Sequence, residues 1–179
     1  MLKASSFSMR LIREKDLDRL FALLNDVSNK GPYYPVDLVS EPDFLRKFQE
    51  TGFWTDEFGR LLIVDDTDNI LGGIHYFMAT PYYSGLEIGY LLFDSAIQGR
   101  GIMTEALTLF SGYLFRTREI NRLELKIHPD NSPSMRVAEK VGFTFEGVAR
   151  QCVRFKEAFA DLHIYSLLRK EYYQTLGNG

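Results

Sequence analysis

The feature that most constrains the fold is a β-α-β pattern in the middle of the chain. Residues 86–93 (LEIGYLLF) have the pattern of a strand, residues 102–116 carry apolar side chains at helical spacing, and residues 122–128 (RLELKIH) alternate strictly between apolar and polar positions. A strand, a helix and a second strand in this order form a crossover whose two strands lie parallel in one sheet. This segment therefore predicts a sheet with at least one parallel pair.

Strand-like and helix-like patterns also alternate along the rest of the chain. Apolar residues recur at helical spacing in three further segments, and short apolar or alternating runs between turn residues mark the remaining strands. The further predicted elements are strands over 7–13, 60–66, 70–79, 143–155 and 159–168, and helices over 16–29, 41–50 and 132–141. The order β-α-α-β-β-β-α-β-α-β-β predicts an α/β (α+β) fold in which a mixed sheet carries helices on its faces.

Composition limits the class of protein. The chain has 179 residues, 45% of them hydrophobic, which suits one domain, 1–179, with a sizeable core. Its formal net charge of −3 gives no electrostatic basis for nucleic acid as the main partner. No run approaches the roughly 20 apolar residues of a membrane span, and the N-terminus lacks the apolar core of a signal peptide. Because Cys152 is the single cysteine, we expect a cytoplasmic protein without disulfides, with this thiol as a small core residue.

A glycine-rich turn precedes the central helix. In QGRG (98–101) two glycines flank Arg100, and the helical pattern begins directly after them. The first N–H groups of a helix lack internal partners, the helix dipole adds positive potential there, and glycines let a backbone approach a phosphate closely. The segment matches neither the P-loop pattern GxxxxGK[ST] nor the dinucleotide pattern GxGxxG. From the residues alone, a pyrophosphate site and a plain helix-entry turn both remain open.

Three motifs, in this order, resemble those of the GCN5-related N-acetyltransferases (GNAT). QGRGIM (98–103) resembles their acetyl-CoA motif Q/R-x-x-G-x-G/A, although Met103 stands where the family usually has glycine or alanine. NSPSMRVAEKVGF (131–143) resembles the next motif, N-x-x-S followed by a short helix and Gly-Phe. FEGVAR (145–150) and DLHIYSLL (161–168) resemble the branch that modifies the N-termini of ribosomal proteins, the RimJ/RimL-like acetyltransferases.

This resemblance covers most of residues 7–169 and implies a mixed, mostly antiparallel central sheet with a parallel, splayed pair and helices on both faces. It also implies acetyl-CoA as co-substrate, with the pyrophosphate on main-chain amides of the glycine loop and the pantetheine arm along backbone groups of LLF (91–93) in the preceding strand. Asn131 and Ser134 would lie beside the pantetheine and the thioester sulfur. The implied cofactor-binding residues are Leu91, Phe93, Gln98, Gly99, Arg100, Gly101, Ile102, Met103, Thr104, Asn131 and Ser134.

The same resemblance implies direct acyl transfer from a thioester to a neutral amine. Such a transfer needs a base for the ammonium proton, and a hydroxyl donor helps the thiolate to leave. Glu87 is the candidate base, because apolar neighbours in the strand before the loop would raise the pKa of its carboxyl. Ser134 is the second catalytic candidate. Plainer interpretations stay open: Glu87 as a solvent-facing strand residue, and Ser134 and Asn131 as helix-start or capping residues.

Aromatic residues in predicted loops are candidates for the wall of the acceptor site. Tyr33, Trp54 and Tyr83, together with His75, are assigned to substrate binding, with a packing or surface role as the plainer alternative for each. The three histidines lack metal-ligand spacing, so no metal is expected. Asp161 is expected to form a structural hydrogen bond near the last hairpin.

The acceptor predicted first is the α-amine at a protein N-terminus, whose pKa of about 7.7–8.0 leaves a useful neutral fraction at pH 7. Small amines (polyamines, aminoglycosides and aminoacyl-nucleotide antibiotics) stay open as acceptors, because fold resemblance does not settle a substrate. A non-catalytic acyl-CoA-binding module is the alternative from another class. We expect neither nucleic acid nor a membrane as partner, and a monomer or homodimer.

Overall fold

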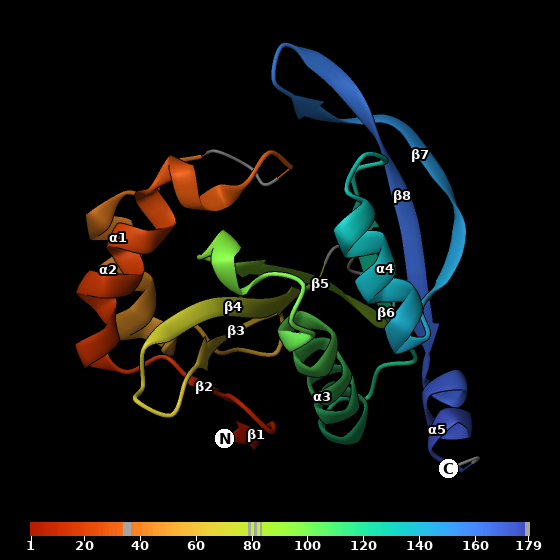
Figure 1. Cartoon of the computed structure of the whole chain (residues 1–179), viewed down its shortest axis with the longest axis horizontal. Coiled ribbons are helices and arrows are strands. Elements are labelled where there is room, and N and C mark those ends of the chain that lie inside the picture. Colours follow the sequence, from red (N-terminus) through yellow and green to blue (C-terminus); the bar gives the residue numbers. More distant parts are fainter. Residues whose placement is uncertain (34–36, 79, 81, 83, 178–179) are drawn as a thin grey trace. The chain divides into compact units, whose positions relative to one another are not determined.

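The structure, a computed structural model, describes residues 1–33, 37–78, 80, 82 and 84–177. Its contacts divide the chain into two compact units, whose elements are labelled in Figure 1. Unit 1 contains Met1–Tyr76 and Gly89–Ile102, and unit 2 contains Phe77–Ile88 and Met103–Gly179. The division passes through two strands, β4 and β5, and the first turn of one helix, α3, which the two units therefore share.

In the described residues, eight strands pair in the order β1-β2-β3-β4-β5-β6-β8-β7. The strands are β1 Leu2–Lys3, β2 Ser8–Leu11, β3 Phe58–Val64, β4 Ile70–Phe77, β5 Gly85–Leu92, β6 Arg122–Ile127, β7 Thr144–Phe155 and β8 Ala158–Leu168. The helices are α1 Leu17–Asn25, α2 Glu41–Thr51, α3 Ile102–Thr117, α4 Ser132–Val141 and α5 Arg169–Gly177, with short 3₁₀ turns η1 Glu14–Asp16, η2 Val27–Lys30 and η3 Ser95–Ile97. β5 and β6 pair in parallel, whereas the registers of β1–β2, β2–β3, β6–β8 and β7–β8 are antiparallel. The predicted mixed, mostly antiparallel sheet with a parallel pair is confirmed.

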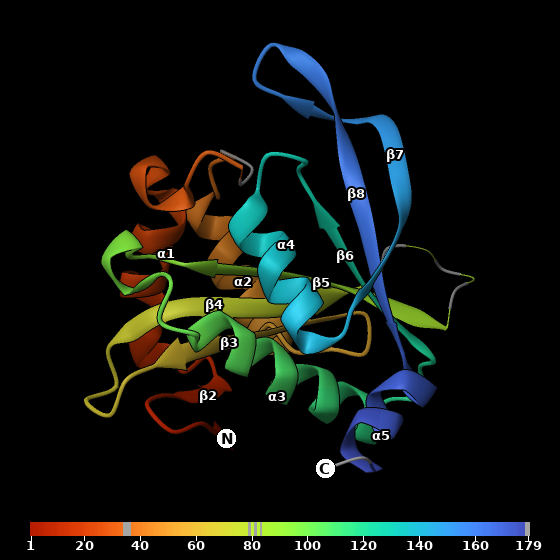
Figure 2. The ribbon, with the colours of Figure 1, turned by 45° about the vertical axis from the view of Figure 1, so that its right-hand side comes forward.

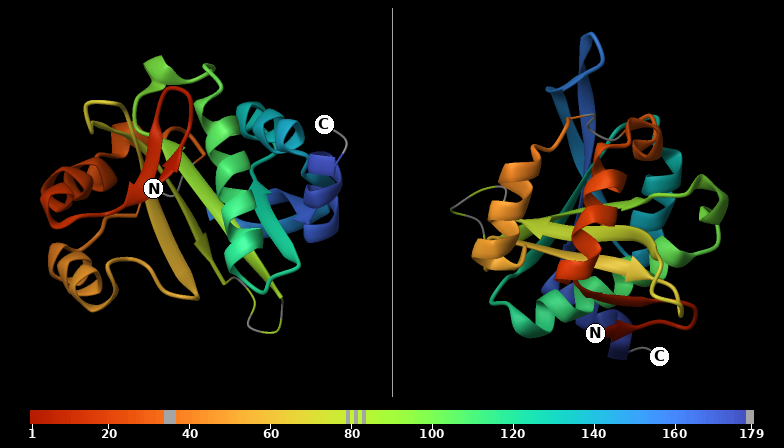
Figure 3. Two further views of the ribbon diagram at one scale, coloured as in Figure 1. Left: turned by 90° about the horizontal axis from the view of Figure 1, so that it is seen from below. Right: turned by 90° about the vertical axis from the view of Figure 1, so that its left-hand side faces the viewer.

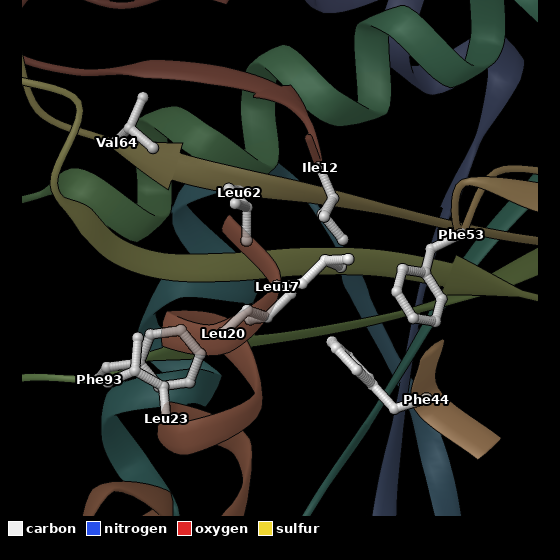
Figure 4. Packing of buried hydrophobic residues seen from close by; sticks show 9 residues of the cluster. All are labelled: Ile12, Leu17, Leu20, Leu23, Phe44, Phe53, Leu62, Val64 and Phe93. Atoms are coloured by element: carbon white, nitrogen blue, oxygen red, sulfur yellow. The ribbon is translucent and has the colours of Figure 1, made fainter. Parts of the chain in front are cut away.

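The core of unit 1 joins α1 and α2 to the strands. Its buried members are Ile12, Leu17, Leu20, Leu23, Phe44, Phe53, Leu62, Val64 and Phe93, shown in Figure 4. The two views of Figure 3 show α1 and α2 side by side, and the ring centroids of Phe21 and Phe44 lie 5.6 Å apart. Phe93 directly follows β5, so the burial of its side chain anchors the start of the loop that leads to α3.

Helix α1 is shorter than the predicted helix over 16–29. It ends at Asn25 because Asp26 takes an extended conformation and its carboxylate accepts a hydrogen bond from the Ser28 amide at 2.9 Å. Such local bonding by aspartate competes with helix continuation, and apolar periodicity does not register it. The other predicted elements form within two residues of their expected bounds, while β1 and α5 were not predicted.

A buried ion network ties β2 to the start of α1 in unit 1. Arg10, which is 4% exposed, binds both carboxylate oxygens of Asp16, with donor–acceptor distances of 2.6 and 2.9 Å. Its Nε donates to Asp68 at 2.7 Å, and Lys15 reaches the same carboxylate. Hydrogen bonds from Lys15 and Arg10 lower the pKa of Asp68 to about 2. Burial alone would raise the pKa of Asp16, but the bonds from Arg10 and from the Arg13 amide hold it below its usual range.

Unit 2 is built around α3. Arg169 caps the carboxyl end of this helix, because its guanidinium donates to backbone carbonyl oxygens that include those of Phe115 and Ile120. Gly112 lets α5 approach α3, since a Cβ at this position would lie 2.1 Å from the hydroxyl oxygen of Tyr172. The helix that follows the glycine loop is thus held at its far end by the C-terminal segment.

The strands β7 and β8 form a long hairpin (Figures 1 and 2). Strand β8 pairs with β6 only from His163 onwards. Before that point, its residues 158–160 and 162 pair with β7 alone. Cys152 lies in an irregular stretch of β7 and is exposed, so its assignment to the core was wrong. The reason is that this part of the hairpin is a two-stranded ribbon, which buries little on either face. Asp161 does form the expected structural bond, accepting from the Gln151 amide at 2.8 Å.

The first prediction concerns the Arg10–Asp16 pair. We expect Asp16→Asn to lower the free energy of unfolding at pH 7 by about 3 kcal/mol, because it removes the buried one of the two carboxylates that balance the buried guanidinium of Arg10. The folded-state pKa of Asp16 is lowered, so its contribution is present above the unfolded pKa near 4 and is lost as the pH falls below it. Urea unfolding at about pH 7 and pH 3 should therefore show a large difference from wild type that narrows in acid.

Asp43→Asn is the matched control, because Asp43 forms exposed ion pairs on the surface of α2. It should leave the urea midpoint close to that of wild type. Equal effects of the two substitutions would contradict a structural role for the buried pair.

Candidate active site

The glycine-rich turn leaves β5 and leads directly into α3. Asp94 accepts a hydrogen bond from the Ala96 amide at 2.8 Å and so starts the 3₁₀ turn η3. This turn ends where the Gln98 amide donates to the Ser95 carbonyl at 3.2 Å. Residues 98–101 are exposed, and they are followed by the first turn of α3, whose leading amides have no partner within the helix. Main-chain donors are thus concentrated at this turn.

The two glycines are required by backbone conformation. Gly99 has a φ of +75° and Gly101 a φ of +82°, a region that side chains other than glycine rarely adopt. A Cβ at either position would meet no heavy atom within 4 Å, so neither glycine makes room for a neighbour in the chain. The left-handed residues bend the backbone on both sides of Arg100 and leave the space above it open.

The side chains around these glycines divide between solvent and core. Arg100 is exposed, and within the described part of the chain it has no carboxylate partner. Met103 is 7% exposed and belongs to the buried hydrophobic set. Its bulk, which departs from the family motif, therefore lies in the core and not on the exposed surface of the loop. Ile102 and Thr104, its neighbours in the first turn of α3, are half-buried.

The end of β5 presents its backbone groups to two different edges. The Phe93 amide donates to the Leu71 carbonyl on β4 at 2.9 Å. Since successive residues of a strand direct their backbone groups to opposite edges, Leu91 faces β4 as Phe93 does, whereas Leu92 faces the other edge. Leu92 lies within residues 91–93, whose backbone the resemblance assigns to the pantetheine arm, and its N–H and C=O have the direction that an added partner along β5 would need.

Glu87 lies at the last position where β5 and β6 pair, opposite Glu124. Its Oε2 atom is 2.7 Å from Nζ of Lys126, and its side chain is only 14% exposed. Burial raises the pKa of Glu87 above its ordinary value, and the hydrogen bond from Lys126 limits that rise. The solvent-facing interpretation is therefore wrong, because Glu87 is a largely buried carboxylate in an ion pair.

A row of charged side chains continues from Glu87 across unit 2. Strand β6 presents Arg122, Glu124 and Lys126 on one face, because alternate side chains of a strand share a face. Arg122 Nε lies 3.2 Å from Glu124 Oε1, and its guanidinium binds the Glu146 carboxylate of β7. This bond, with one from the Ser166 hydroxyl, lowers the pKa of Glu146 to about 2.

A cavity of about 520 Å³ lies over this row. Its lining residues are Tyr82, Ser84, Asn121, Arg122, Glu124, Glu146 and Ile164. It carries one guanidinium and two carboxylates, so its lining is mixed in charge. Because Glu124 both lines the cavity and stands opposite Glu87, the cavity begins one strand away from the candidate base.

Asn131 and Ser134 open helix α4. The Oδ1 atom of Asn131 accepts a hydrogen bond from the Ser134 amide at 3.3 Å, so Asn131 is the N-cap, as the plainer interpretation expected. This cap engages the carbonyl oxygen of the Asn131 side chain and leaves its Nδ2 donors outside the bond. Both side chains are half-buried.

Trp54 packs within unit 1. Its ring meets that of Tyr76 edge-on, with centroids 5.4 Å apart, and Tyr76 donates a hydrogen bond to the Thr55 carbonyl. A Cβ at Gly59 would collide with both rings, so this packing is specific to glycine at that position. Tyr33 is half-buried, and Tyr83 lies outside the described residues.

His75 also has neighbours in unit 1. Its ring lies 6.1 Å from that of Phe58 and covers Gly89, where a Cβ would be 2.5 Å from Nε2. Burial, with a smaller effect of Arg60, lowers the pKa of His75 to about 3, so its imidazole is neutral at pH 7. Packing accounts for the positions of Trp54 and His75, and their contact with an acceptor stays a prediction.

The ionic partners of Glu87 were missed at the level of sequence. The alternation of RLELK does place Arg122, Glu124 and Lys126 on one face, and that signal was available. What the sequence lacks is the register of β5 against β6, which decides that Glu87 stands beside these residues.

In the part of the chain that the structure describes, no helix has both the length and the apolar character needed to cross a membrane. No group of three or more His, Cys, Asp and Glu residues is arranged to hold a metal ion among the described residues.

Comparison with known proteins shows the family. Residues 7–144 match the family described as acetyltransferase (GNAT) domain. The chain is 36% identical over 174 residues to the "Putative ribosomal N-acetyltransferase YdaF" of Bacillus subtilis (strain 168), a match that covers 92% of each protein. It is 32% identical over 111 residues to the "Uncharacterized N-acetyltransferase p20" of Bacillus licheniformis, covering 62% of each. The chain belongs to the GNAT family of acetyltransferases, and it is an N-acetyltransferase.

Solved structures share the fold. RimL, a ribosomal L7/L12 α-N-protein acetyltransferase in complex with coenzyme A, has a TM-score of 0.80 and 21% identity, covering 94% of this chain and 97% of RimL. The spermidine N-acetyltransferase of Vibrio cholerae in complex with CoA and spermine has a TM-score of 0.81 and 16% identity, covering 95% and 99%. At these identities the likeness establishes the fold, and the two relatives differ in acceptor.

The second prediction tests the glycine loop. We expect calorimetric titration to show micromolar binding of acetyl-CoA to the wild type, and binding weaker by roughly tenfold or more in Gly101→Trp. The reason is that an indole at Gly101 would fill the open space over the exposed amides. Gly52→Trp is the control, because Gly52 also has a positive φ (+61°) and open space but ends α2. Equal affinities of the two variants would count against the loop as the pyrophosphate site.

Proposed function

We propose that the protein transfers the acetyl group of acetyl-CoA to the α-amine of a protein or peptide N-terminus, by direct attack of the amine in a ternary complex. The observation that carries this proposal is the state of Glu87. Glu87 lies at the end of the parallel β5–β6 pairing, where its carboxylate is largely buried and forms an ion pair with Lys126. Burial also raises its pKa, and these are the properties of a general base.

The loop residues fit acetyl-CoA. Exposed amides at 98–101, the positive end of the α3 dipole and the exposed side chain of Arg100 suit a diphosphate group. The backbone of Leu92 would pair with an amide of the pantetheine arm. Asn131 Nδ2 and the Ser134 hydroxyl are further donors at the start of α4. Acetyl-CoA itself supplies the activated acetyl group as a thioester.

The chemistry of the step follows from these groups. The acceptor arrives mostly as an ammonium ion, and the Glu87 carboxylate accepts one of its protons, which frees the nitrogen lone pair to attack the thioester carbonyl. The C–S bond of the resulting tetrahedral adduct then breaks, and the Ser134 hydroxyl donates a hydrogen bond to the departing sulfur. The second proton of the attacking nitrogen passes to the thiolate, so the products are the acetylated amine and the free thiol of CoA. Because an α-amine has a pKa of about 7.7–8.0, little driving force is needed to deprotonate it near neutral pH.

The lining of the cavity favours a peptide over a polyamine as acceptor. A polyamine carries a second ammonium group close to the first. Both carboxylates of the lining, Glu124 and Glu146, are already paired with Arg122, so this second ammonium group would have to compete with the guanidinium for them. A peptide has uncharged backbone donors and acceptors beside its α-amine, which the mixed lining of Ser84, Asn121 and Glu124 can bind. The relationship to YdaF, which is named as a putative ribosomal N-acetyltransferase, supports the same choice.

The third prediction concerns the base. We expect Glu87→Gln to reduce the rate of acetyl transfer by roughly tenfold or more, because glutamine keeps the size of the side chain but accepts no proton. Thiol release measured at saturating acetyl-CoA checks this. Glu157→Gln, on the exposed turn between β7 and β8, is the matched control and should leave the rate unchanged. Full activity of Glu87→Gln would remove Glu87 from the mechanism.

The fourth prediction concerns the acceptor. In a thiol-release screen, short peptides with a free N-terminus should be acetylated with higher kcat/KM than spermidine or an aminoglycoside, and N-terminally blocked peptides should be inert. Mass spectrometry of the product should locate the acetyl group on the α-nitrogen. Preference for spermidine over every peptide tested would overturn the choice of acceptor while leaving the transferase activity intact.

A further inference from the structure

Glu87 is engaged by two groups of opposite effect, both on β6. Lys126 Nζ lies 2.7 Å from Glu87 Oε2, and Glu124 stands directly opposite Glu87 in the parallel register. The Glu87 and Lys126 side chains are 14% and 32% exposed, so water screens the pair only partly. Glu124 is held in turn by Arg122, whose Nε is 3.2 Å from its carboxylate. The candidate base therefore sits between one cation and one anion.

These contacts have opposite consequences for the charge of Glu87. Burial and the neighbouring carboxylate of Glu124 both favour the neutral acid, and the ammonium of Lys126 favours the carboxylate. A base is useful only while it is ionised, so without Lys126 a smaller fraction of Glu87 could accept a proton near neutral pH. The groups that act on Lys126 itself are Glu87, Glu124 and the thiol of Cys152 on β7.

We infer that Lys126 is a positioning residue, which keeps the Glu87 carboxylate ionised and oriented for proton transfer, and that Glu124 opposes it. This inference rests on the proposed function, in which Glu87 is the base. The register of β5 against β6 sets Glu87 opposite Glu124. Lys126 lies two residues further along the same face of β6, so the same register also places its ammonium group within hydrogen-bond distance of the Glu87 carboxylate. None of these three residues belongs to the glycine loop.

Three variants separate the electrostatic role from a structural one. Lys126→Met keeps an unbranched apolar stem and removes the charge, Lys126→Arg keeps the charge, and Glu124→Gln removes the opposing charge. We expect the acid limb of log kcat/KM against pH, measured from about pH 5.5 to 9, to move up by roughly one to three pH units in Lys126→Met. It should stay close to wild type in Lys126→Arg and move down in Glu124→Gln. A merely structural role would lower the rate at every pH without moving the limb.

Titration of the Glu87 carboxyl carbon by ¹³C NMR, in the free protein, gives a readout that does not depend on activity. The same order is expected: Lys126→Met above wild type, Lys126→Arg near it and Glu124→Gln below it. If the carboxyl titrates alike in all four proteins, the inference is overturned. If the NMR titration moves as expected but the acid limb does not, Lys126 still sets the charge of Glu87, and it is the proposed role of Glu87 as base that fails. Should Lys126→Met fail to fold, Lys126→Arg and Glu124→Gln still decide between these outcomes.

Discussion

The parallel pairing of β5 and β6 is the constraint on which the site depends. It comprises three residue pairs and ends with Glu87 opposite Glu124. Two carboxylates opposite one another repel, and the register is tolerable because Arg122 and Lys126 place a cation beside each of them. A slip of one residue in this register would turn Glu87 to the other face of the sheet. The position of the candidate base therefore depends directly on the register of β5 against β6.

Two kinds of recognition meet in the proposed reaction. The glycine loop offers main-chain amides, whose direction is set by the left-handed conformations of Gly99 and Gly101 and by the start of α3. The proton transfer relies instead on side chains, Glu87 and Lys126, that come together only through strand pairing. This difference explains why the departure at Met103 is compatible with the site. An amide donor remains whatever the side chain, and this side chain is buried in the core.

Much of the fold could be predicted, because periodicity reports which side of an element is buried. The β-α-β crossover, the hairpins and the helix N-capped by Asn131 follow from local pattern and appear close to their expected bounds. Predictions of helix length and of side-chain burial failed where these depend on the residues that contact a helix or strand and not on its own apolar pattern. Helix α1 stops early because Asp26 accepts a hydrogen bond from the Ser28 amide, and Cys152 is exposed because it lies in an irregular stretch of the β7–β8 ribbon. Helix α5 was missed because its apolar signal is weak, although Tyr172 packs against Gly112.

The sequence by itself determined the glycine turn, its place between a strand and a helix, and the family to which those motifs point. These are properties of contiguous residues, and a short peptide segment already contains the conformational preferences that produce them. Only the tertiary structure decided which edge Leu92 presents, that Glu87 is buried, and that Lys126 and Glu124 compete for its charge. The physical reason is that burial and ion pairing depend on residues nearly 40 positions apart, and no local periodicity encodes the register that brings them together.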